Sequence, residues 1–229
     1  QGIDMNNGLR ILKRHRAVAL DLAQQFLDIP VANVSDCMNR MAAGGPRLRP
    51  MHAGGRMAGP ALTVKVRPGD NLMIHKALQM VQPGDIIVVD GGGDLTNALI
   101  GEIMLGDAIQ QKAGGVVING AIRDAAEVRS MRLPVFAAGV THRGPYKDGP
   151  GEINVPIALD GMVIEPGDLI IGDDDGLLCV PYEDVSTLLE AARKKQTVEA
   201  GMIAAIDAGN YDRSWVDATL QRLNCFIEA

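Results

Sequence analysis

The sequence of 229 residues contains few aromatic side chains, no long apolar run and no paired cysteines. Aromatic residues make up 3% of the chain, so we expect a core of Val, Ile, Leu, Ala and Met. No apolar run reaches the roughly 18 residues that a membrane span needs, and the N-terminal stretch lacks the apolar centre of a signal peptide. Cys37, Cys179 and Cys225 are odd in number and far apart, which indicates reduced thiols. We therefore expect a cytoplasmic protein that makes no contact with a membrane.

Positive charge and the usual nucleotide-binding motifs are also scarce. Lys and Arg total 22 against 28 Asp and Glu, and the net charge of −6 disfavours direct binding of nucleic acid. The sequence contains neither a G-x-G-x-x-G pattern nor a G-x-x-x-x-G-K-[ST] loop, which argues against nucleotide binding by these loops. The four histidines show no H-x-x-x-H zinc spacing. With 47% hydrophobic and 22% charged residues, the composition is typical of a globular protein with a sizeable core.

Alternating strand and helix patterns in the middle of the chain predict an α/β fold. The segment 86–90, IIVVD, is apolar without alternation, as expected of a strand that is buried on both faces. Helices are predicted after Asp70, from about Thr96 to Lys112, and after Asp124. This alternation favours a sheet that is at least partly parallel. The predicted strands are 61–66, 86–90, the segment GGVVING at 114–120, and 134–140.

The two ends of the chain are predicted to be helical. Apolar residues at helical spacing indicate a helix from Ala17 to Asp28, and a second helix follows Asn33 or Ser35. A loop rich in Gly, Pro and Arg covers 42–55, and several short strands follow residue 150. A long helix is predicted from Tyr182 to about Ala208, with a short one after Ser214. Because no linker interrupts the sequence, we expect one domain over 1–229, with an N-terminal helical segment to about residue 45 and a C-terminal helical extension over 182–229.

The most informative part of the sequence surrounds two predicted turns from strand to helix. One buried strand ends in the glycine-rich turn 91–94, and a helix begins near Gly101 and Glu102. Twenty residues after Glu102, another buried strand ends at Arg123 and Asp124. Because the carboxyl ends of parallel strands meet the amino ends of helices, we expect these residues to lie at one edge of the sheet. The free N–H groups at such helix starts favour an anion.

Each of these residues also has a structural interpretation. Asp124 and Glu127 have the spacing of a capping box, in which both side chains serve their own helix. Arg123 is compatible with a surface ion pair of little energetic value. His75 lies one turn beyond Asn71 on a predicted helix, so this helix could present both side chains to a cleft, although a histidine at such a position is more often packed or at the surface.

Several segments together resemble the regulator of ribonuclease activity A family: GDIIVVDGGGDLTNALIGEIM, GGVVINGAIRDAAEV, PVFAAGV and PGDLIIGDDDGLLCVP. The resemblance covers roughly residues 56–208. The enzymatic branch, the 4-hydroxy-4-methyl-2-oxoglutarate/4-carboxy-4-hydroxy-2-oxoadipate aldolases, carries an acid, twenty residues, Arg-Asp, two residues and another acid. Glu102, Arg123, Asp124 and Glu127 match this spacing, although the aldolases commonly have Asp at the first position. The resemblance implies an α-β-β-α sandwich like the phosphohistidine swivelling domain.

The resemblance also implies roles for these residues. Asp124 would bind a divalent cation, Mg²⁺ or Mn²⁺, Arg123 would hold the substrate, and Glu102 would take part in catalysis. Glu127 and Glu199 would complete the metal site, with Glu199 acting through water from the long C-terminal helix of a neighbouring subunit. The family implies a homotrimer or a pair of trimers, with sites between subunits. With Asn71 added from its place on the predicted helix, the substrate-binding residues are Gly101, Glu102, Ile103, Met104, Arg123 and Asn71.

The function that this resemblance implies is a class II pyruvate aldolase. Such an enzyme cleaves a 4-hydroxy-2-oxo dicarboxylic acid to pyruvate, and the cation stabilises the enolate that forms. Because oxaloacetate gives the same enolate when it loses CO₂, we also expect oxaloacetate decarboxylase activity. A water held near the cation by Glu102, Glu127 or Glu199 would act as the base. The alternative is a non-catalytic protein that binds and inhibits a ribonuclease or helicase, as the founding branch of the family does.

Overall fold

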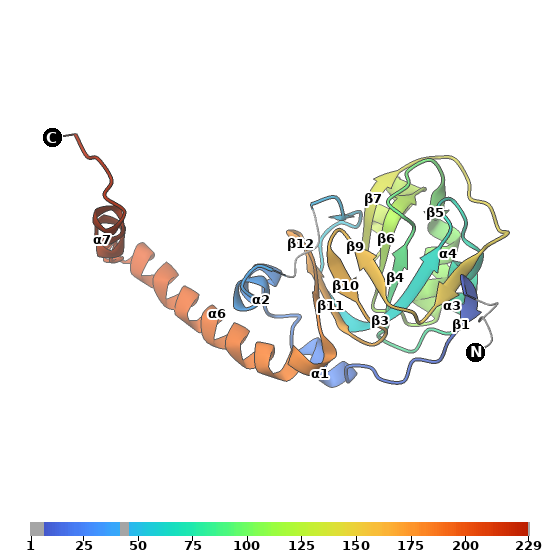
Figure 1. Cartoon of the computed structure of the whole chain (residues 1–229), viewed down its shortest axis with the longest axis horizontal. Coiled ribbons are helices and arrows are strands. Elements are labelled where there is room, and N and C mark those ends of the chain that lie inside the picture. Colours follow the sequence, from blue (N-terminus) through green and yellow to red (C-terminus); the bar gives the residue numbers. More distant parts are fainter. Residues whose placement is uncertain (1–6, 42–45, 229) are drawn as a thin grey trace. The chain divides into compact units, whose positions relative to one another are not determined.

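The structure, a computed structural model, describes residues 7–41 and 46–228. The chain forms two compact units, residues 1–192 and residues 193–229. The first unit is a mixed α/β structure, which confirms the predicted class (Figure 1). Its strands are β1 (Leu9–Ile11), β2 (Arg49–Pro50), β3 (Met57–Val66), β4 (Ile86–Asp90), β5 (Ala98–Ile100), β6 (Gly115–Ile122), β7 (Val135–Val140), β8 (Gly151–Ile153), β9 (Ile157–Leu159), β10 (Met162–Ile164), β11 (Leu169–Asp173) and β12 (Gly176–Val180).

In the first unit, helices lie on either side of these strands. The second unit contains the rest of the longest helix and one further helix. A short 3-10 helix, η1 (Tyr182–Asp184), precedes the longest helix. The α-helices are α1 (Leu20–Gln24), α2 (Val31–Cys37), α3 (Leu72–Leu78), α4 (Glu102–Gln110), α5 (Ala125–Ser130), α6 (Val185–Asp207) and α7 (Ser214–Arg222).

A mixed sheet forms the centre of the first unit. Its main path runs β1-β8-β3-β4-β6-β7-β2. Strands β3, β4, β6 and β7 are parallel neighbours, and β5 also pairs in parallel with β6. Strand β11 pairs antiparallel with both β3 and β12, whereas β9 and β10 form a separate hairpin. The parallel part therefore brings the carboxyl ends of β4 and β6 to one edge, as the sequence predicts, and the unpredicted strand β5 ends at the same edge.

Three hydrophobic cores separate four layers in the first unit. The first core, which includes Leu62 and Ile87, lies between one face of the sheet and helices α3, α4 and α5. The second, which includes Ala61 and Ile86, lies between the other face and strands β9 to β12. Neighbouring residues of β3 and of β4 thus point to opposite faces, which is the alternation expected of strands buried on both sides. The third core packs β11 and β12 against α1, α2 and the start of α6. The layer order is helix, strand, strand, helix (Figure 1). The likeness to the phosphohistidine swivelling domain stays a prediction.

Some predicted boundaries are wrong. The helix predicted from about Thr96 begins at Glu102, because Ala98–Ile100 is buried and pairs with β6 as strand β5. The helix predicted over 17–28 contains only Leu20–Gln24, and turns follow it. Strand β1, which pairs with β8, was not predicted. Within the predicted loop 42–55, residues 49–50 form β2, and residues 42–45 lie outside the described residues.

The C-terminal unit contains the second part of α6 and helix α7. Both helices were predicted, the long one from Tyr182 to about Ala208 and the short one after Ser214. Several large apolar side chains of this unit are exposed, namely Val198, Met202, Ile203, Ile206, Trp215, Leu223, Phe226 and Ile227. No helix in the described ranges combines the length and the apolar composition needed to cross a membrane.

Candidate functional site

Two strand-to-helix turns lie side by side, one after β5 and one after β6. Helix α4 begins at Glu102, directly after β5, and α5 begins at Ala125, directly after β6. The N–H of Arg123 donates to the carbonyl of Ile100 (3.0 Å), which continues the parallel pairing to the end of both strands. The structure thus brings together the residues that the sequence places at this edge.

The Asp124 carboxylate connects the starts of the two helices. Its Oδ2 accepts a hydrogen bond from the backbone N–H of Glu102 at 2.9 Å, and it lies 3.7 Å from Nε of Arg123. Asp124 makes no side-chain cap for its own helix α5, so the capping-box interpretation of Asp124 is wrong. The reason is the backbone, which adopts the left-handed conformation at Asp124 (φ 58°, ψ 44°) and directs the carboxylate toward α4.

Gly101 leaves room for this contact. A Cβ atom at position 101 would lie 2.4 Å from Oδ2 of Asp124 and 2.9 Å from Cγ of Arg123, both below normal contact distances. The backbone of Gly101 is extended (φ −148°, ψ −168°), a conformation that any residue can adopt. Glycine is therefore required here for space rather than for backbone freedom.

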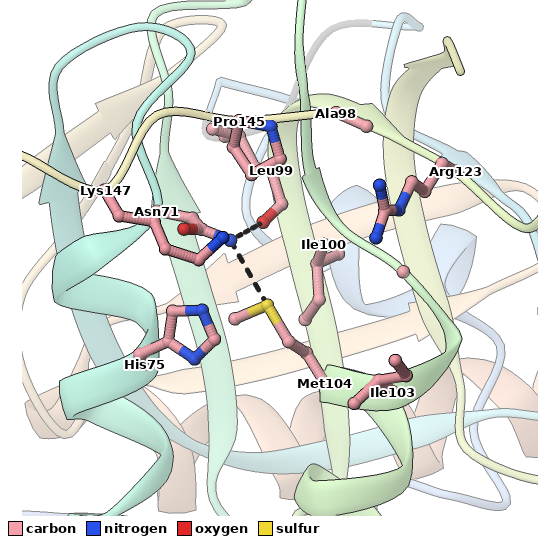
Figure 2. Close-up of a pocket in the computed structure, with 11 residues that line it drawn as sticks. Asn71, His75, Ala98, Leu99, Ile100, Ile103, Met104, Arg123, Pro145 and Lys147 are labelled. Carbon is pink, nitrogen blue, oxygen red and sulfur yellow. Dashed lines mark hydrogen bonds between the residues drawn. The ribbon is translucent and has the colours of Figure 1, made fainter. Parts of the chain in front are cut away.

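A small cleft opens beside this junction. Its volume is about 160 Å³, well below the roughly 300–1,000 Å³ of pockets that hold drug-sized molecules, so it suits a small molecule. Figure 2 shows Arg123 on one side of the cleft, Asn71, His75 and Lys147 on the other, and Ile100 and Met104 between them. The lining residues are Asn71, His75, Ala98, Leu99, Ile100, Gly101, Ile103, Met104, Arg123, Pro145 and Lys147.

Asn71, the N-cap residue of α3, and His75 within α3 both line the cleft. The Asn71 amide nitrogen donates to the carbonyl of Leu99 (3.0 Å) and to Sδ of Met104 (3.3 Å), so it ties α3 to the start of α4. The Oδ1 atom of Asn71 and Nε2 of His75 are buried and have no hydrogen-bond partner among the described residues. Burial lowers the pKa of His75, and the nearby charge of Lys147 lowers it further, against a smaller opposing effect of Asp107. His75 is therefore neutral at pH 7.

Lys147 belongs to the cleft and was not predicted from the sequence. The loop that carries it is held by the buried carboxylate of Asp70, whose Oδ2 accepts hydrogen bonds from the N–H groups of Asp148 (2.7 Å) and Gly149 (2.9 Å). The other oxygen accepts from the N–H of Leu72 at the start of α3 (3.0 Å). Burial raises the pKa of Asp70, but these hydrogen bonds and the charge of Arg67 outweigh burial and leave it below the ordinary value. No local motif signals this contact, because about 80 residues separate its partners.

The remaining predicted residues lie in different surroundings. Glu102 and Ile103 are exposed at the first turn of α4, and Ile103 has 83% of its surface accessible, whereas Met104 is buried. Glu127 is exposed on α5, one turn from Asp124. Glu199 belongs to the C-terminal unit, where it forms an ion pair with Lys195 at 3.1 Å. The roles of Glu127 and Glu199 stay predictions.

The carboxylates at the junction suit a hard cation that keeps most of its water. Oδ1 of Asp124 has no hydrogen-bond partner in the described ranges, and Glu102 lies beside it with an exposed side chain. Mg²⁺ usually binds one or two protein carboxylates and retains several waters, so the Asp124 carboxylate fits it. In the part of the chain that the structure describes, no group of three or more His, Cys, Asp or Glu side chains could hold a metal, so one chain does not form a closed zinc-type cage there.

Comparison with known proteins assigns the family. Residues 31–179 match the family model described as "RraA-like: Aldolase/RraA". The chain belongs to the RraA-like family. This match spans the cleft, the Arg123–Asp124 pair and most of the layered unit, and it confirms the resemblance seen in the sequence.

Relatives of this RraA-like protein include proteins named as aldolases. A protein of Halalkalibacterium halodurans, named "Putative 4-hydroxy-4-methyl-2-oxoglutarate aldolase", is 38% identical over 82% of this chain and 89% of its own length. The "4-hydroxy-4-methyl-2-oxoglutarate aldolase" of Thermus thermophilus is 36% identical over 55% of this chain and 76% of its own. The solved structure of Streptomyces coelicolor RraAS2, described as an unusual member of the RNase ES inhibitor RraA family, is 25% identical. The superposition covers 81% of this chain and 96% of the RraAS2 chain, with a TM-score of 0.74. The family thus contains proteins named for two different activities.

Proposed function

We propose that this RraA-like protein is a divalent-metal-dependent aldolase that cleaves a 4-hydroxy-2-oxo dicarboxylic acid to pyruvate. The observation that carries the proposal is the junction of the two strand-to-helix turns. There Asp124 accepts the first N–H of α4 and lies 3.7 Å from Arg123, which lines one end of the small cleft. This arrangement offers a carboxylate for a cation and a guanidinium for an anion within a few ångströms. The names of the aldolase relatives support the same reaction class.

The reaction requires an electron sink next to the bond that breaks. When the C3–C4 bond of the substrate is cleaved, its electron pair moves into the C2 carbonyl to give the enolate of pyruvate, and the C4 hydroxyl loses its proton to become a carbonyl. A divalent cation at Asp124 would supply Lewis-acid stabilisation of that enolate. The Arg123 guanidinium would bind the 2-oxo acid through its planar fork and add a second positive charge beside the developing anion.

The proton of the C4 hydroxyl needs an acceptor at the open side of the junction. Glu102 is exposed there, at the first turn of α4, and its carboxylate is a suitable group to hold a water that takes this proton. After cleavage, the enolate carbon C3 takes up a proton to give pyruvate. Loss of CO₂ from oxaloacetate would leave the same enolate, so we propose oxaloacetate decarboxylation as a second activity of this site.

We further propose that Glu199 of a second subunit completes the site in a trimer or a pair of trimers. In the described chain, exposed apolar residues surround Glu199 on α6, among them Val198, Met202 and Ile203, which suits a helix that packs against another copy. Mixing inactive Asp124→Ala and Glu199→Ala proteins, after dissociation and reassembly, tests this idea. Recovery of activity in the mixture supports a shared site, whereas a mixture as inactive as its components contradicts it.

A coupled assay for pyruvate tests the reaction itself. With Mg²⁺ or Mn²⁺, the protein should release pyruvate from 4-hydroxy-4-methyl-2-oxoglutarate and from oxaloacetate, and EDTA should abolish the release. Asp124→Asn should lower kcat/KM at least about 100-fold, because the amide is a poor cation ligand, while it can keep the left-handed turn and the hydrogen bond to Glu102. Arg129→Gln, an exposed arginine on α5 that does not line the cleft, should leave activity unchanged. Absence of pyruvate from both substrates would overturn the proposal.

Inhibition of a ribonuclease is the second candidate function, because Streptomyces coelicolor RraAS2 is described as a member of the RNase ES inhibitor RraA family. Capture of a ribonuclease from solution by the pure protein, together with unchanged capture by Asp124→Asn, would support this candidate. A protein that releases pyruvate and captures no ribonuclease would exclude it.

A further inference from the structure

The cleft has two polar ends with an apolar floor between them. Arg123 forms one end, next to the Asp124 junction, and His75 and Lys147 form the other (Figure 2). The floor between them includes Ile100 and Met104, which are buried and offer no charge. A molecule that fills such a cleft has a polar group at each extremity and a less polar middle.

The backbone on both sides of Lys147 is fixed by hydrogen bonds, and its exposed side chain lines the cleft. Asp70 fixes the backbone immediately after Lys147 through the N–H groups of Asp148 and Gly149. The residue before it, Tyr146, exchanges backbone hydrogen bonds with the segment 69–71. Within the described ranges, Lys147 forms no ion pair with an acidic side chain, so its ammonium group remains available to a ligand anion.

His75 supplies a neutral hydrogen-bonding group at the same end. Its Nε2 atom is buried without a partner among the described residues, which is costly unless a ligand or water satisfies it. A neutral imidazole can donate one N–H to a carboxylate oxygen while Lys147 supplies the positive charge. The nearby Asp107 carboxylate is the group that would oppose an anion, but its influence on His75 is smaller than that of Lys147.

We infer that His75 and Lys147 bind the distal carboxylate of the substrate, so that they select 4-hydroxy-2-oxo dicarboxylic acids over the corresponding monocarboxylic acids. This inference rests on the proposed aldolase function and adds the residues that recognise the distal carboxylate of the substrate. Arg123 and the start of α4 would hold the 2-oxo acid end, and the apolar floor would face the carbon chain between the two anchors.

Two pairs of compounds that differ in the distal carboxylate test this inference. The substrates are 4-hydroxy-4-methyl-2-oxoglutarate and 4-hydroxy-2-oxopentanoate, and the inhibitors, which cannot be cleaved, are 2-oxoglutarate and 2-oxopentanoate. Lys147→Met should lower kcat/KM for the diacid about 10- to 100-fold, as expected for the loss of one charge-assisted hydrogen bond, and raise Ki for 2-oxoglutarate by a similar factor. For the monoacids both constants should change less than about threefold.

Two further variants separate recognition from general damage. His75→Gln retains an N–H donor and should affect the diacid less than His75→Phe does, while neither should change Ki for 2-oxopentanoate by more than about threefold. Lys76→Met removes an exposed lysine of the same helix α3 that does not line the cleft, and it should behave as the wild type.

The outcomes distinguish the inference from the function on which it rests. If the wild-type protein releases pyruvate from the diacid, but Lys147→Met and His75→Phe weaken diacids and monoacids equally or not at all, the distal anchor is wrong and the aldolase stands. If the wild-type protein cleaves none of these compounds, the aldolase and the anchor are both overturned.

Discussion

Replacement of Gly101 by alanine should disable the site while leaving the fold in place. The added Cβ would lie 2.4 Å from Oδ2 of Asp124 and 2.9 Å from Cγ of Arg123, about 1 Å closer than ordinary contacts allow. The backbone at position 101 is extended, so alanine causes no strain of its own. The clash must therefore be relieved by moving the Asp124 and Arg123 side chains, and this breaks the 2.9 Å hydrogen bond to the N–H of Glu102.

The expected magnitude follows from the size of this movement. A displacement of about 1 Å in a catalytic group commonly costs about 100-fold in rate, so kcat/KM for pyruvate release should fall by that order. The free energy of unfolding should fall by only about 1 kcal/mol, because one hydrogen bond at a partly exposed helix start is lost. Urea unfolding and the coupled pyruvate assay measure the two quantities on the same preparations.

Gly106 provides the matched control. It lies in the same helix, α4, and a Cβ there would meet no atom within 4 Å. Gly106→Ala should keep full activity and raise the free energy of unfolding by about 0.5–1 kcal/mol, because alanine favours a helix interior over glycine. The steric reasoning fails if a folded Gly101→Ala protein keeps wild-type activity, or if Gly106→Ala loses as much as Gly101→Ala does.

Two further predictions concern the side of the cleft opposite Arg123. Asp70→Asn should lower the free energy of unfolding by about 2–4 kcal/mol, because the amide cannot accept all the backbone hydrogen bonds that the two carboxylate oxygens of this buried residue accept. Urea unfolding measures this change, and Asp148→Asn, at an exposed position, is the control. If the Asp70→Asn and Asp148→Asn proteins were equally stable, the role of Asp70 would be contradicted. The lowered pKa of His75 predicts that stability falls as pH decreases below about 6.5, the ordinary value of histidine, since the unfolded chain then takes up a proton that the native chain does not. His75→Gln should reduce this slope in unfolding experiments between pH 7 and 5, and an unchanged slope would show that His75 is not its source.

The sequence predicts the position of Arg123 and Asp124 well because that prediction depends on local order. A buried strand followed at once by a helix places its last residues at the sheet edge in any parallel arrangement, and no distant contact is needed to infer this. Gly101 and Glu102 also lie at this edge, but they follow β5 rather than the predicted strand 86–90. By contrast, the helix predicted from Thr96 was wrong because three buried apolar residues, Ala98–Ile100, pair with β6 and override their local pattern.

Other features could not be predicted because they arise from contacts between distant parts of the chain. Lys147 enters the cleft because Asp70, about 80 residues earlier, holds the loop after it. The capping-box interpretation of Asp124 failed because it assumed that the backbone continues normally into α5, whereas Asp124 adopts a positive φ. Residue spacing gives no information on either point.

The left-handed turn at Asp124 restricts how this position can vary. Asparagine and aspartate tolerate this conformation better than other residues with a Cβ, and either side chain can accept the N–H of Glu102. Exchanging the acid for its amide would thus remove a charged ligand without rebuilding the junction. A lineage with this architecture can lose a carboxylate-dependent reaction through one substitution and keep an intact scaffold. This gives a structural route by which one family can contain proteins named as aldolases and proteins named as RNase inhibitors.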